Sequence, residues 1–592
     1  MSIVTLEKVT IFGLGVDKTK ILQGLQQLGC LHLIPLQPPP KETEFGTSDR
    51  YQQAQAALFH IMDVPRRRHQ VYNPTEFDLD QVIAQALENK QKRREAEDKK
   101  LILSERLETL APWGNFTLPT LEALGGYRLW FYQVPHRQAK EIEKIDFPWQ
   151  IVGDNHLSVY LVVIAKEEPP SHLLTVPRIH AGSISPKELQ EQLEALEIEL
   201  DDLKAEQEAL SRWIFLLSQK LARAEDQVAL EKARQQAKEE DGIFRVQGWI
   251  PKRSLKQLDA FAEQQGLAYL AEPPKPTEKP PTLMENAPLF REGQELVTFY
   301  ETPGYRTWDP SSVVFFSFAL FFAIILSDAG YALVLAVLLG IYWRSMGQTE
   351  GGKYFRSLCV AGLTLGVIYG VLVGSYFGVE PPKDSLLAYL KRLNLNDYNG
   401  MMRFSIAIGC LHLAFANGVI AVNGVGFAEK AKPLGFIAVI FGGFALYQGL
   451  SHLGLGLLCG GFLVIFLGGV VGSEKVFPWG IIDGFSALIK GSQLFGDIMS
   501  YLRLFALGLA SGSLALTFNQ LAQQVHQTMP GTGLDIFLSL LILLLGHTIN
   551  LLLAIMSGFV HGLRLNFIEF FNWGLTEEGY PFQAFSKKEN HS

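Results

Sequence analysis

The sequence lacks the motifs that mark the commonest catalytic sites. It has no GxxxxGK[ST] loop for phosphates, no HExxH pair for zinc and no nucleophile elbow. Its four cysteines have neither the spacing of metal ligands nor that of a disulfide framework. We therefore expect no cofactor, no metal site and no catalytic nucleotide site in this chain.

An excess of positive charge is also missing. The net charge is −8 over 592 residues, so no nucleic-acid partner is expected. The N-terminus has no basic stretch followed by an apolar one, so it is not a secretory signal peptide. We expect the first half of the chain to stay in the cytoplasm.

What is present divides into two halves. Residues 1–300 carry most of the charge, whereas residues 311–570 are largely apolar. A Pro-rich extended stretch at 272–283 separates them, within a linker over 272–310. The fold class predicted is an α-helical polytopic membrane domain with an N-terminal cytoplasmic α/β arm.

The cytoplasmic half contains two strand–helix–strand patterns. The first covers residues 1–36, and its helix ends at Gly29, a residue type common at helix C-termini. The second, between 242 and 273, is expected to return beside the first. We predict a proximal α/β lobe formed by 1–77 with 242–271.

Two long helical segments, 78–112 and 186–241, lie between these patterns. In the second, apolar residues recur at alternating steps of 4 and 3, with only Gln207 breaking the seam, which is typical of a coiled coil. The segment between them, 113–185, contains two strand-like runs. We predict an antiparallel coiled coil with a distal α/β lobe, acting as a spacer or oligomerisation arm, or as a strut that holds partners away from the membrane.

Several apolar runs in the second half are long enough to cross a bilayer. They cover 357–378, 402–423, 433–451, 453–471, 493–524 and 534–568. An earlier run, 311–343, would measure about 50 Å as one helix, well over the ~30 Å hydrocarbon core. Ser327, Asp328 and Gly330 interrupt it, so it is either one kinked helix or two short spans.

Basic residues in the loops decide between these alternatives. The loop after that run contains Arg344, Lys353 and Arg356, so the positive-inside rule places it in the cytoplasm and requires two crossings before it. Since each crossing changes the side of the membrane, three further segments also fall in the cytoplasm. The first contains Lys430 and Lys432, the second Glu474, Lys475 and Lys490, and the third Lys587 and Lys588. We predict eight spans, with seven as the alternative, in a transmembrane domain over 311–570. Both termini are then cytoplasmic, the second as a tail over 571–592.

The last two spans carry polar residues in helical register. At ~100° per residue, each set falls within an arc of about 120° or less. The seventh span presents Gln493, Asp497, Ser500, Arg503 and Ser511, and the eighth presents His547, Asn550, Ser557, His561 and Arg564.

An arginine at mid-membrane depth costs ~2.5–3.5 kcal/mol. Because guanidinium keeps its proton at any working pH, it cannot relay protons, but it can force a passing carboxylate to ionise. At ~4 Å and an effective dielectric near 20 the attraction is about 4 kcal/mol, or roughly 3 pKa units. The alternative for each arginine is a structural ion pair or a side chain that snorkels to the interface.

The direction of each span assigns these residues to two sides. Gln493, Asp497 and Ser500 lie on the cytoplasmic side of Arg503, and Glu569 lies on the inner side of Arg564. The outer side of Arg564 carries His547, Asn550, Ser557 and His561. This predicts two offset half-channels separated by the arginines. Interhelical hydrogen bonding remains the alternative for His547, as does a structural role for His561 and, at a turn, for Asp328.

At these residues the sequence resembles the V/A-type (vacuolar-type) rotary ATPase subunit a, or subunit I, of the 116 kDa subunit family. SYLRLFALGLA at 500–510 and HGLRLNFIEFF at 561–571 are similar to its two arginine motifs. DAGYALVL at 328–335 is similar to its GDxGYG hairpin, with Ser327 and Ala332 in place of two glycines. Further similar segments are LQQLGCLHL at 25–33, VQGWIP at 246–251, LVGSYFG at 372–378 and IGCLHLAFANG at 408–418.

The resemblance implies a non-catalytic membrane stator subunit that couples proton or sodium transport to ATP hydrolysis or synthesis. Arg503 and Arg564 would face a ring of proteolipid subunits, each with an essential carboxylate, within membrane lipid. The arm would bind peripheral stalk subunits and so connect to the soluble V1/A1 ATPase sector. The membrane would be the plasma membrane if the source is prokaryotic. The alternatives are a stand-alone secondary ion transporter with a cytoplasmic regulatory arm and a membrane-anchored scaffold.

Overall fold

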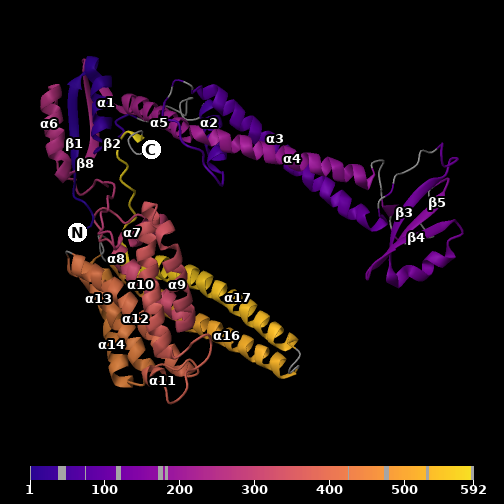
Figure 1. Ribbon diagram of the computed structural model, residues 1–592. Coiled ribbons are helices and arrows are strands. Elements are labelled where there is room, and N and C mark those ends of the chain that lie inside the picture. Colours follow the sequence, from indigo (N-terminus) through magenta and orange to yellow (C-terminus); the bar gives the residue numbers. More distant parts are fainter. Residues whose placement is uncertain are drawn as a thin grey trace. The chain divides into compact units, whose positions relative to one another are not determined.

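The computed structural model is mostly helical, with two β-sheets (Figure 1). It describes residues 2–37, 49–73, 75, 77–114, 116, 122–167, 169–170, 176, 178–179, 185–424, 426–472, 479–528 and 533–588. The chain divides into two compact units, which are described separately. One comprises Met1–Phe12, Cys30–Ile34 and Gln247–Ala584, and the other comprises Gly13–Gly29, Pro35–Val246 and Phe585–Ser592.

The first sheet has the strand order β2-β8-β1-β9, with β7 paired to β8. Its strands are β1 (Leu6–Leu14), β2 (His32–Ile34), β7 (Lys238–Glu240), β8 (Ile243–Pro251) and β9 (Ala268–Glu272). Since β8 lies between β2 and β1, the expectation that the second strand–helix–strand pattern returns beside the first is confirmed. Helices α1 (Lys18–Leu28) and α6 (Leu255–Gln265) connect the strands, and α1 ends at Gly29 in the left-handed region.

The coiled coil pairs α3 (Leu79–Leu110) with α4 (Pro186–Leu210), and α5 (Ile214–Gln236) continues the second arm after a 3₁₀ turn at Ser211–Trp213. Five leucines of the predicted seam on α4 are buried, namely Leu189, Leu196, Leu200, Leu203 and Leu210, whereas Leu193 is half-buried. Gln207 is buried too, and its amide donates to the His60 and Asp63 carbonyls at 2.7 and 3.1 Å. The polar break in the seam is therefore satisfied by hydrogen bonds.

Two features of this arm differ from the expectation. The second helix ends at Gln236, because Lys238–Glu240 forms β7 and turns back into β8 through Asp241 and Gly242, both with positive φ. A helix that the hydrophobic pattern did not indicate, α2 (Asp49–Met62), packs against α3 and α5. Where α2 lies, the coiled-coil arm therefore has three helices instead of two.

The distal sheet has the order β4-β5-β3-β6. Its strands are β3 (Arg128–Pro135), β4 (Trp149–Asp154), β5 (Ser158–Ala165) and β6 (Arg178–Ile179). Strands β3 and β5 are the two strand-like runs that the sequence indicated, and they pair over their full length.

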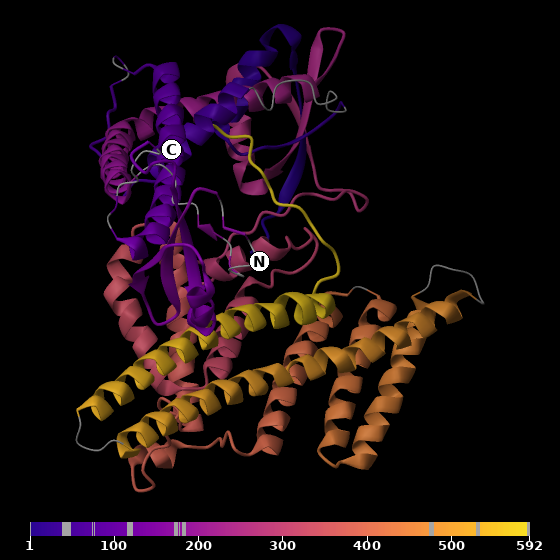
Figure 2. The same cartoon turned by 90° about the vertical axis from the view of Figure 1, so that its right-hand side faces the viewer.

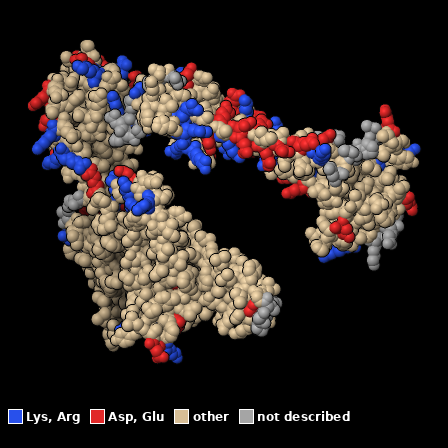
Figure 3. Space-filling view, viewed as in Figure 1, with Lys and Arg blue, Asp and Glu red and all other residues tan. Residues whose placement is uncertain are grey.

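The apolar half is a bundle of helices with very few charges on the surface that Figure 3 shows. Seven described helical segments are long and apolar enough to cross a membrane, and α8 is a shorter apolar one. The helices are α7 (Arg291–Tyr300), α8 (Ser311–Leu326), α9 (Ala329–Met346), α10 (Glu350–Val373), α11 (Leu386–Leu390), α12 (Tyr398–Asn423), α13 (Phe427–Tyr447), α14 (Ser451–Val471), α15 (Trp479–Ser500), α16 (Leu502–Thr528), α17 (Leu534–Arg564) and α18 (Phe571–Gly574). Glu474 and Lys475, used above to assign the topology, lie outside the described residues.

The ambiguous first run is two helices that fold back on each other. Near its start, α8 packs Phe315 and Phe318 against Leu358 early in α10. The end of α9 meets the same part of α10, where Arg356 Nη1 donates to the Trp343 carbonyl at 2.9 Å. The chain therefore reverses between α8 and α9, at Ser327 (φ 51°), and the single over-long helix is excluded.

Asp328 sits in that reversal as the N-cap of α9. Its Oδ1 accepts from the backbone N–H groups of Tyr331 and Phe377, both at 3.0 Å. Its Oδ2 accepts from Ser375 Oγ at 2.6 Å and from the Gly378 N–H at 2.9 Å. Four donors thus surround a buried carboxylate and join the turn to the end of α10.

The C-terminal tail is bonded to the linker and to strand β2. The Gly579 N–H donates to the Thr302 carbonyl at 2.8 Å, and Thr282 pairs with Pro581. Further along, the Gln583 N–H donates to His32 Nδ1 at 2.9 Å. Burial lowers the pKa of the His32 imidazole below its usual value of 6.5, so at neutral pH the ring is uncharged and Nδ1 can accept.

This contact predicts that the tail loosens in acid. A histidine whose pKa is depressed in the folded protein contributes stability that is complete above its unfolded pKa and declines as the pH falls below it. Protonated Nδ1 carries a hydrogen and cannot accept, so below about pH 6.5 the Gln583 amide should lose protection from hydrogen exchange relative to the Gly579 amide. Equal loss at both amides, or the same pH dependence in His32→Phe, would contradict this.

Candidate functional site

Three helices of the membrane half carry the predicted site. Figure 2 shows α16 and α17 side by side, steeply inclined to their neighbours, with α15 continuing the line of α16. Helices α16 and α17 are antiparallel, since Asn550 bonds the Ser511 carbonyl and Ser539 bonds the Ala522 carbonyl, both at 2.9 Å. The predicted opposition of two polar faces on consecutive helices is therefore observed.

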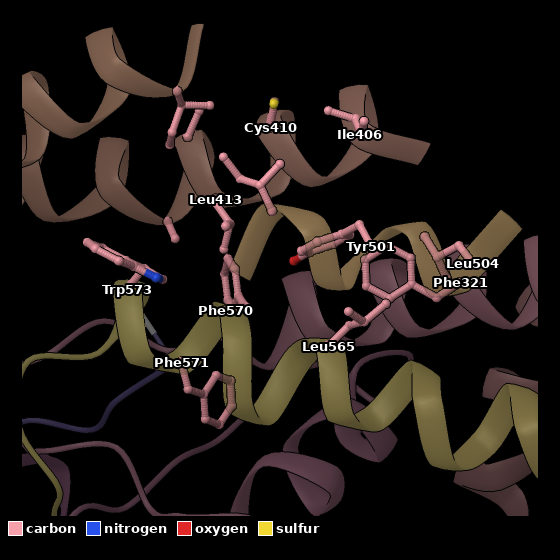
Figure 4. Packing of buried hydrophobic residues seen from close by; sticks show 14 of the residues in the cluster. Phe321, Ile406, Cys410, Leu413, Tyr501, Leu504, Leu565, Phe570, Phe571 and Trp573 are labelled. Atoms are coloured by element: carbon pink, nitrogen blue, oxygen red, sulfur yellow. The ribbon is translucent and has the colours of Figure 1, made fainter. Parts of the chain in front are cut away.

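Only Tyr501 separates α15 from α16. Its side chain is fully buried, and its hydroxyl hydrogen bonds His412 Nδ1 on α12 at 2.7 Å. The His412 ring stacks on Phe570, with centroids 4.3 Å apart and planes 7° apart. Figure 4 shows Tyr501 and Phe570 in the apolar cluster between these helices. This packing fixes the direction in which α16 leaves the break, and with it the position of Arg503.

The structure brings together Arg503, Arg564, His561 and Glu569. Arg564 Nε lies 3.8 Å from Glu569 Oε1, and its side chain is 50% exposed whereas that of Glu569 is 2% exposed. The charges of both arginines act on each other, on Glu569 and on His561. One carboxylate thus faces two fixed positive charges.

Several polar atoms of this cluster have no hydrogen-bond partner. Among the described residues these atoms include Arg503 Nη1, His561 Nδ1 and Glu569 Oε2. Leaving a buried polar atom unpaired costs about 1–3 kcal/mol, and more for a charged group. The cluster therefore has bonding capacity for a further polar group.

A second group of polar contacts involves Asp497 and Ser500, which precede Arg503, and residues that follow Arg564. Trp573 Nε1 donates to Asp497 Oδ2 at 2.6 Å, and the Lys490 ammonium lies 5.3 Å from the centre of the Trp573 ring. Ser500 lies within hydrogen-bonding reach of Glu569, besides bonding the Gly496 carbonyl of its own helix. Asp497 and Ser500 therefore lie near two residues that follow Arg564 in the chain, Trp573 and Glu569.

A cavity of about 530 Å³ opens beside Asp497. Its lining includes Gln493, Lys490, Glu301, Glu577 and Glu578. Carboxylates outnumber the one ammonium among these groups, so the cavity attracts cations.

A third group lies at the far end of the α16–α17 hairpin. His547 Nδ1 hydrogen bonds the Tyr331 hydroxyl at 2.7 Å, and its Nε2 pairs with Asn519 Oδ1 at 3.1 Å. The buried Asn550 donates to the Tyr331 hydroxyl at 3.0 Å. The interhelical hydrogen bonds considered as the alternative for His547 are thus present.

Of the predicted outer residues, His561 lies in the arginine cluster, but His547 and Asn550 do not reach it. His547 precedes Arg564 by 17 positions and Asn550 by 14, which is about 26 and 21 Å along a helix. Ser557 is half-buried between the two groups. The polar residues therefore form two sets with the arginine cluster between them.

Four contributors were not singled out from the sequence as site residues. They are Tyr331, Asn519, Trp573 and Asn566. Tyr331 stands within the quoted segment DAGYALVL, which was a usable signal. Asn519 lies about 40° beyond the predicted polar arc at 100° per residue. Trp573 follows the apolar run, so neither residue belongs to the polar arcs of the last two spans.

Removing the Tyr331 hydroxyl tests the outer network. Tyr331→Phe should lower the free energy of unfolding by about 1–3 kcal/mol, because Asn550 and His547 each lose a buried partner. Thermal unfolding in detergent measures this, with Tyr342→Phe as the control, since Tyr342 lies on the same helix and is 59% exposed. Equal melting temperatures for the two variants would show that the network adds nothing to stability.

Comparison with known proteins gives consistent results. The family model described as the V-type ATPase 116kDa subunit family matches residues 495–587, which include both arginines. The A-type ATP synthase subunit I of Methanocaldococcus jannaschii is 28% identical over 455 residues, or 68% of this chain and 64% of that protein. The chain thus spans a little under two thirds of that relative's length.

Another relative matches over the whole chain. The V-type ATP synthase subunit I 1 of Treponema pallidum is 25% identical over 653 aligned positions, covering 99% of this chain and 100% of that protein. A crystal structure of the cytoplasmic N-terminal domain of subunit I, a homolog of subunit a of V-ATPase, covers 45% of this chain at 15% identity, with a TM-score of 0.23.

The helices long enough to span a bilayer agree with these matches. The chain is an integral membrane protein, and the matched family model and relatives support its place in the V-type ATPase 116 kDa subunit family.

Proposed function

We propose that this chain is the non-catalytic membrane stator subunit of a rotary ATPase, which passes protons or sodium ions between two half-channels against a ring of proteolipid subunits. The observation that carries the proposal is the pair of arginines on the α16–α17 hairpin, of which Arg503 is partly buried and Arg564 is exposed. Arg564 is half exposed there, amid exposed apolar side chains such as Met556, Val560 and Ile568.

Helix α17 is poorly covered by the rest of the chain. Within its most apolar stretch 11% of the residues are buried, against 50% for α12. Lipid alone would leave the unpaired polar atoms of the arginine cluster unsatisfied. A partner helix that brings a carboxylate to this face would give the unpaired Arg503 Nη1 donor an acceptor.

The chemistry follows from the permanent charge of the arginines. A carboxylic acid buried in a lipid-facing ring favours its neutral form, because burial penalises ionisation. Beside Arg503 the attraction of about 4 kcal/mol reverses that preference, so the acid releases its ion there. Rotation of the ring would carry each carboxylate from one access path to the other.

The inner access path would run through the acidic cavity to Asp497 and Glu569. Glu301, Glu577 and Glu578 line this cavity and would concentrate cations in it. Asp497 accepts from the Trp573 indole through Oδ2 and also lines the cavity.

The outer access path would pass the network of His547, Asn550 and Tyr331. Imidazole, amide and phenol groups can each donate and accept hydrogen bonds, so they can hold a chain of water molecules or ions. Ser557 lies between this network and the arginines. With both termini cytoplasmic, this path would open to the opposite side of the membrane, the plasma membrane in a prokaryote.

The coiled-coil arm would resist the torque of the ring. A pair of helices, with 32 residues in α3 and 25 in α4, is a rigid connector that can hold peripheral stalk subunits. Nucleotide catalysis would belong to the soluble V1/A1 sector. A stand-alone transporter accounts less well for subunit I relatives that match 99% of this chain.

Replacing Arg503 tests the proposal. In the assembled complex in vesicles, Arg503→Ala should abolish ATP-driven ion uptake, because a loss of about 4 kcal/mol corresponds to about a thousandfold. Purification with ring and soluble subunits shows whether assembly is intact. Arg403→Ala is the control, since Arg403 is an exposed arginine at the start of α12. Undiminished coupled uptake in Arg503→Ala would refute the proposed function.

Replacing Asp497 tests the inner path by itself. Asp497→Leu should reduce uptake at least tenfold and shift its half-saturation to higher ion concentrations on the cytoplasmic side, because the path loses its polar group next to the cavity. Asp384→Leu, at an exposed carboxylate between α10 and α11, should leave both quantities unchanged. An unaltered concentration dependence in Asp497→Leu would remove Asp497 from the path.

A further inference from the structure

The helix that carries Arg564 does not continue as an α-helix. Leu565–Phe570 forms a π-helical turn between α17 and α18, and the Phe571 N–H bonds the Asn566 carbonyl five residues earlier. Single π turns within α-helices are rare and concentrate at functional sites. This one begins at the residue after Arg564 and contains Glu569.

The π turn explains why Glu569 meets Arg564. At about 100° per residue an α-helix would place Glu569 about 140° around the axis from Arg564, since five steps amount to one turn and 140° more. A turn closed by an i→i+5 bond brings residues five apart onto the same side. The observed 3.8 Å between Arg564 Nε and Glu569 Oε1 depends on that wider turn.

The neighbouring residue shows the alternative register. In an α-helix the side chain four positions after Arg564 shares its face, and that residue is Ile568. In the structure Ile568 is 49% exposed, whereas Glu569 is 2% exposed. The π turn therefore brings beside the arginine a buried carboxylate that an α-helix would turn about 140° away.

One buried asparagine braces this turn. Asn566 is fully buried, and its Nδ2 donates to the Gly562 carbonyl at 2.9 Å. Its Oδ1 accepts a hydrogen bond from the Ser317 hydroxyl on α8. Side chains that bond into the i→i−4 ladder are a recognised cause of such helix distortions.

A second contact fixes the far end of the turn. Phe570 is fully buried, and its ring stacks on His412 of α12. Figure 4 shows Leu565 and Phe570 on the same ribbon, with Phe570 directed toward the helix that carries Leu413. The turn is thus anchored to α8 at Asn566 and to α12 at Phe570.

We propose that Asn566, held by Ser317, is a positioning residue that keeps Leu565–Phe570 in the π register and thereby places the Glu569 carboxylate beside Arg564. The inference rests on the proposed function, because it assigns Glu569 to the inner access path. Asn566 itself need not touch the transported ion. It acts by deciding which side chain faces the arginine.

Asn566→Leu tests the register. The leucine keeps the branching at Cγ but makes neither hydrogen bond, and it favours an α-helix, so ion uptake by the assembled complex should fall at least tenfold. Asn417→Leu is the matched control, because the Asn417 amide also bonds the carbonyl four residues earlier, at 2.9 Å, but in the regular helix α12. It should transport normally.

Moving the carboxylate separates positioning from simple stabilisation. In the Asn566→Leu background, Ile568→Glu combined with Glu569→Ile should recover uptake at least fivefold over Asn566→Leu alone, because an α-helical turn presents position 568 to Arg564. With Asn566 intact, the same two substitutions should abolish uptake. Full uptake in Asn566→Leu overturns the proposal, and so does a failure of the relocated carboxylate to restore it.

Two further variants keep these outcomes decisive. If Asn566→Leu does not assemble, Ser317→Ala replaces it as the background, since it removes only the donor to Asn566 Oδ1, and the same two results are required. Arg503→Ala is measured in parallel. Retained uptake in Arg503→Ala refutes the proposed function, whereas its loss together with full uptake in Asn566→Leu refutes the register proposal alone.

Discussion

The arrangement of the membrane half depends on how two arginines and one glutamate are held in apolar surroundings. Like charges on Arg503 and Arg564 repel, and a bilayer gives neither of them water to relieve the cost. Glu569 offsets part of that repulsion from a buried position. It does so without cancelling the positive charge, since one carboxylate faces two guanidinium groups. A net positive charge thus remains on the poorly covered face of α17, where a mobile carboxylate could meet it.

The surrounding packing serves this charge cluster. His412 of α12 contacts both interruptions, since it hydrogen bonds Tyr501 at the break and stacks on Phe570 in the π turn. The π turn also contacts α8 through the hydrogen bond of Asn566 with Ser317. Each interruption changes which side chains a long helix presents. The polar residues on either side then separate into an inner set around Asp497 and an outer set around His547. Apolar contacts and a few buried hydrogen bonds therefore determine the positions of the arginine and carboxylate side chains.

Much of this could be predicted, and the failures have identifiable causes. The heptad seam, the strands and the apolar runs are local periodicities, so they could be recognised without a partner in view. The polar arc from Gln493 to Ser511 was drawn as if one helix were continuous, but the break at Tyr501 interrupts it. Helix α2 has a weak apolar pattern and is buried only because α3 and α5 cover it. Tyr331 joins the site from a segment remote in sequence, and Trp573 bonds Asp497, which lies 76 positions earlier in the chain.

The sequence by itself determined that the chain has a charged arm and an apolar helical half, and that two arginines lie within long apolar helices. These features follow from composition and periodicity, which can be recognised within a short stretch of sequence. Only the tertiary structure decided that the run at 311–343 folds back on itself, that Asp497 bonds Trp573 and that Glu569 lies beside Arg564. The physical reason is that each of these depends on a break in helical regularity or on contact between distant segments. Sequence spacing cannot anticipate a turn that widens from α to π because an asparagine is braced by a serine on another helix.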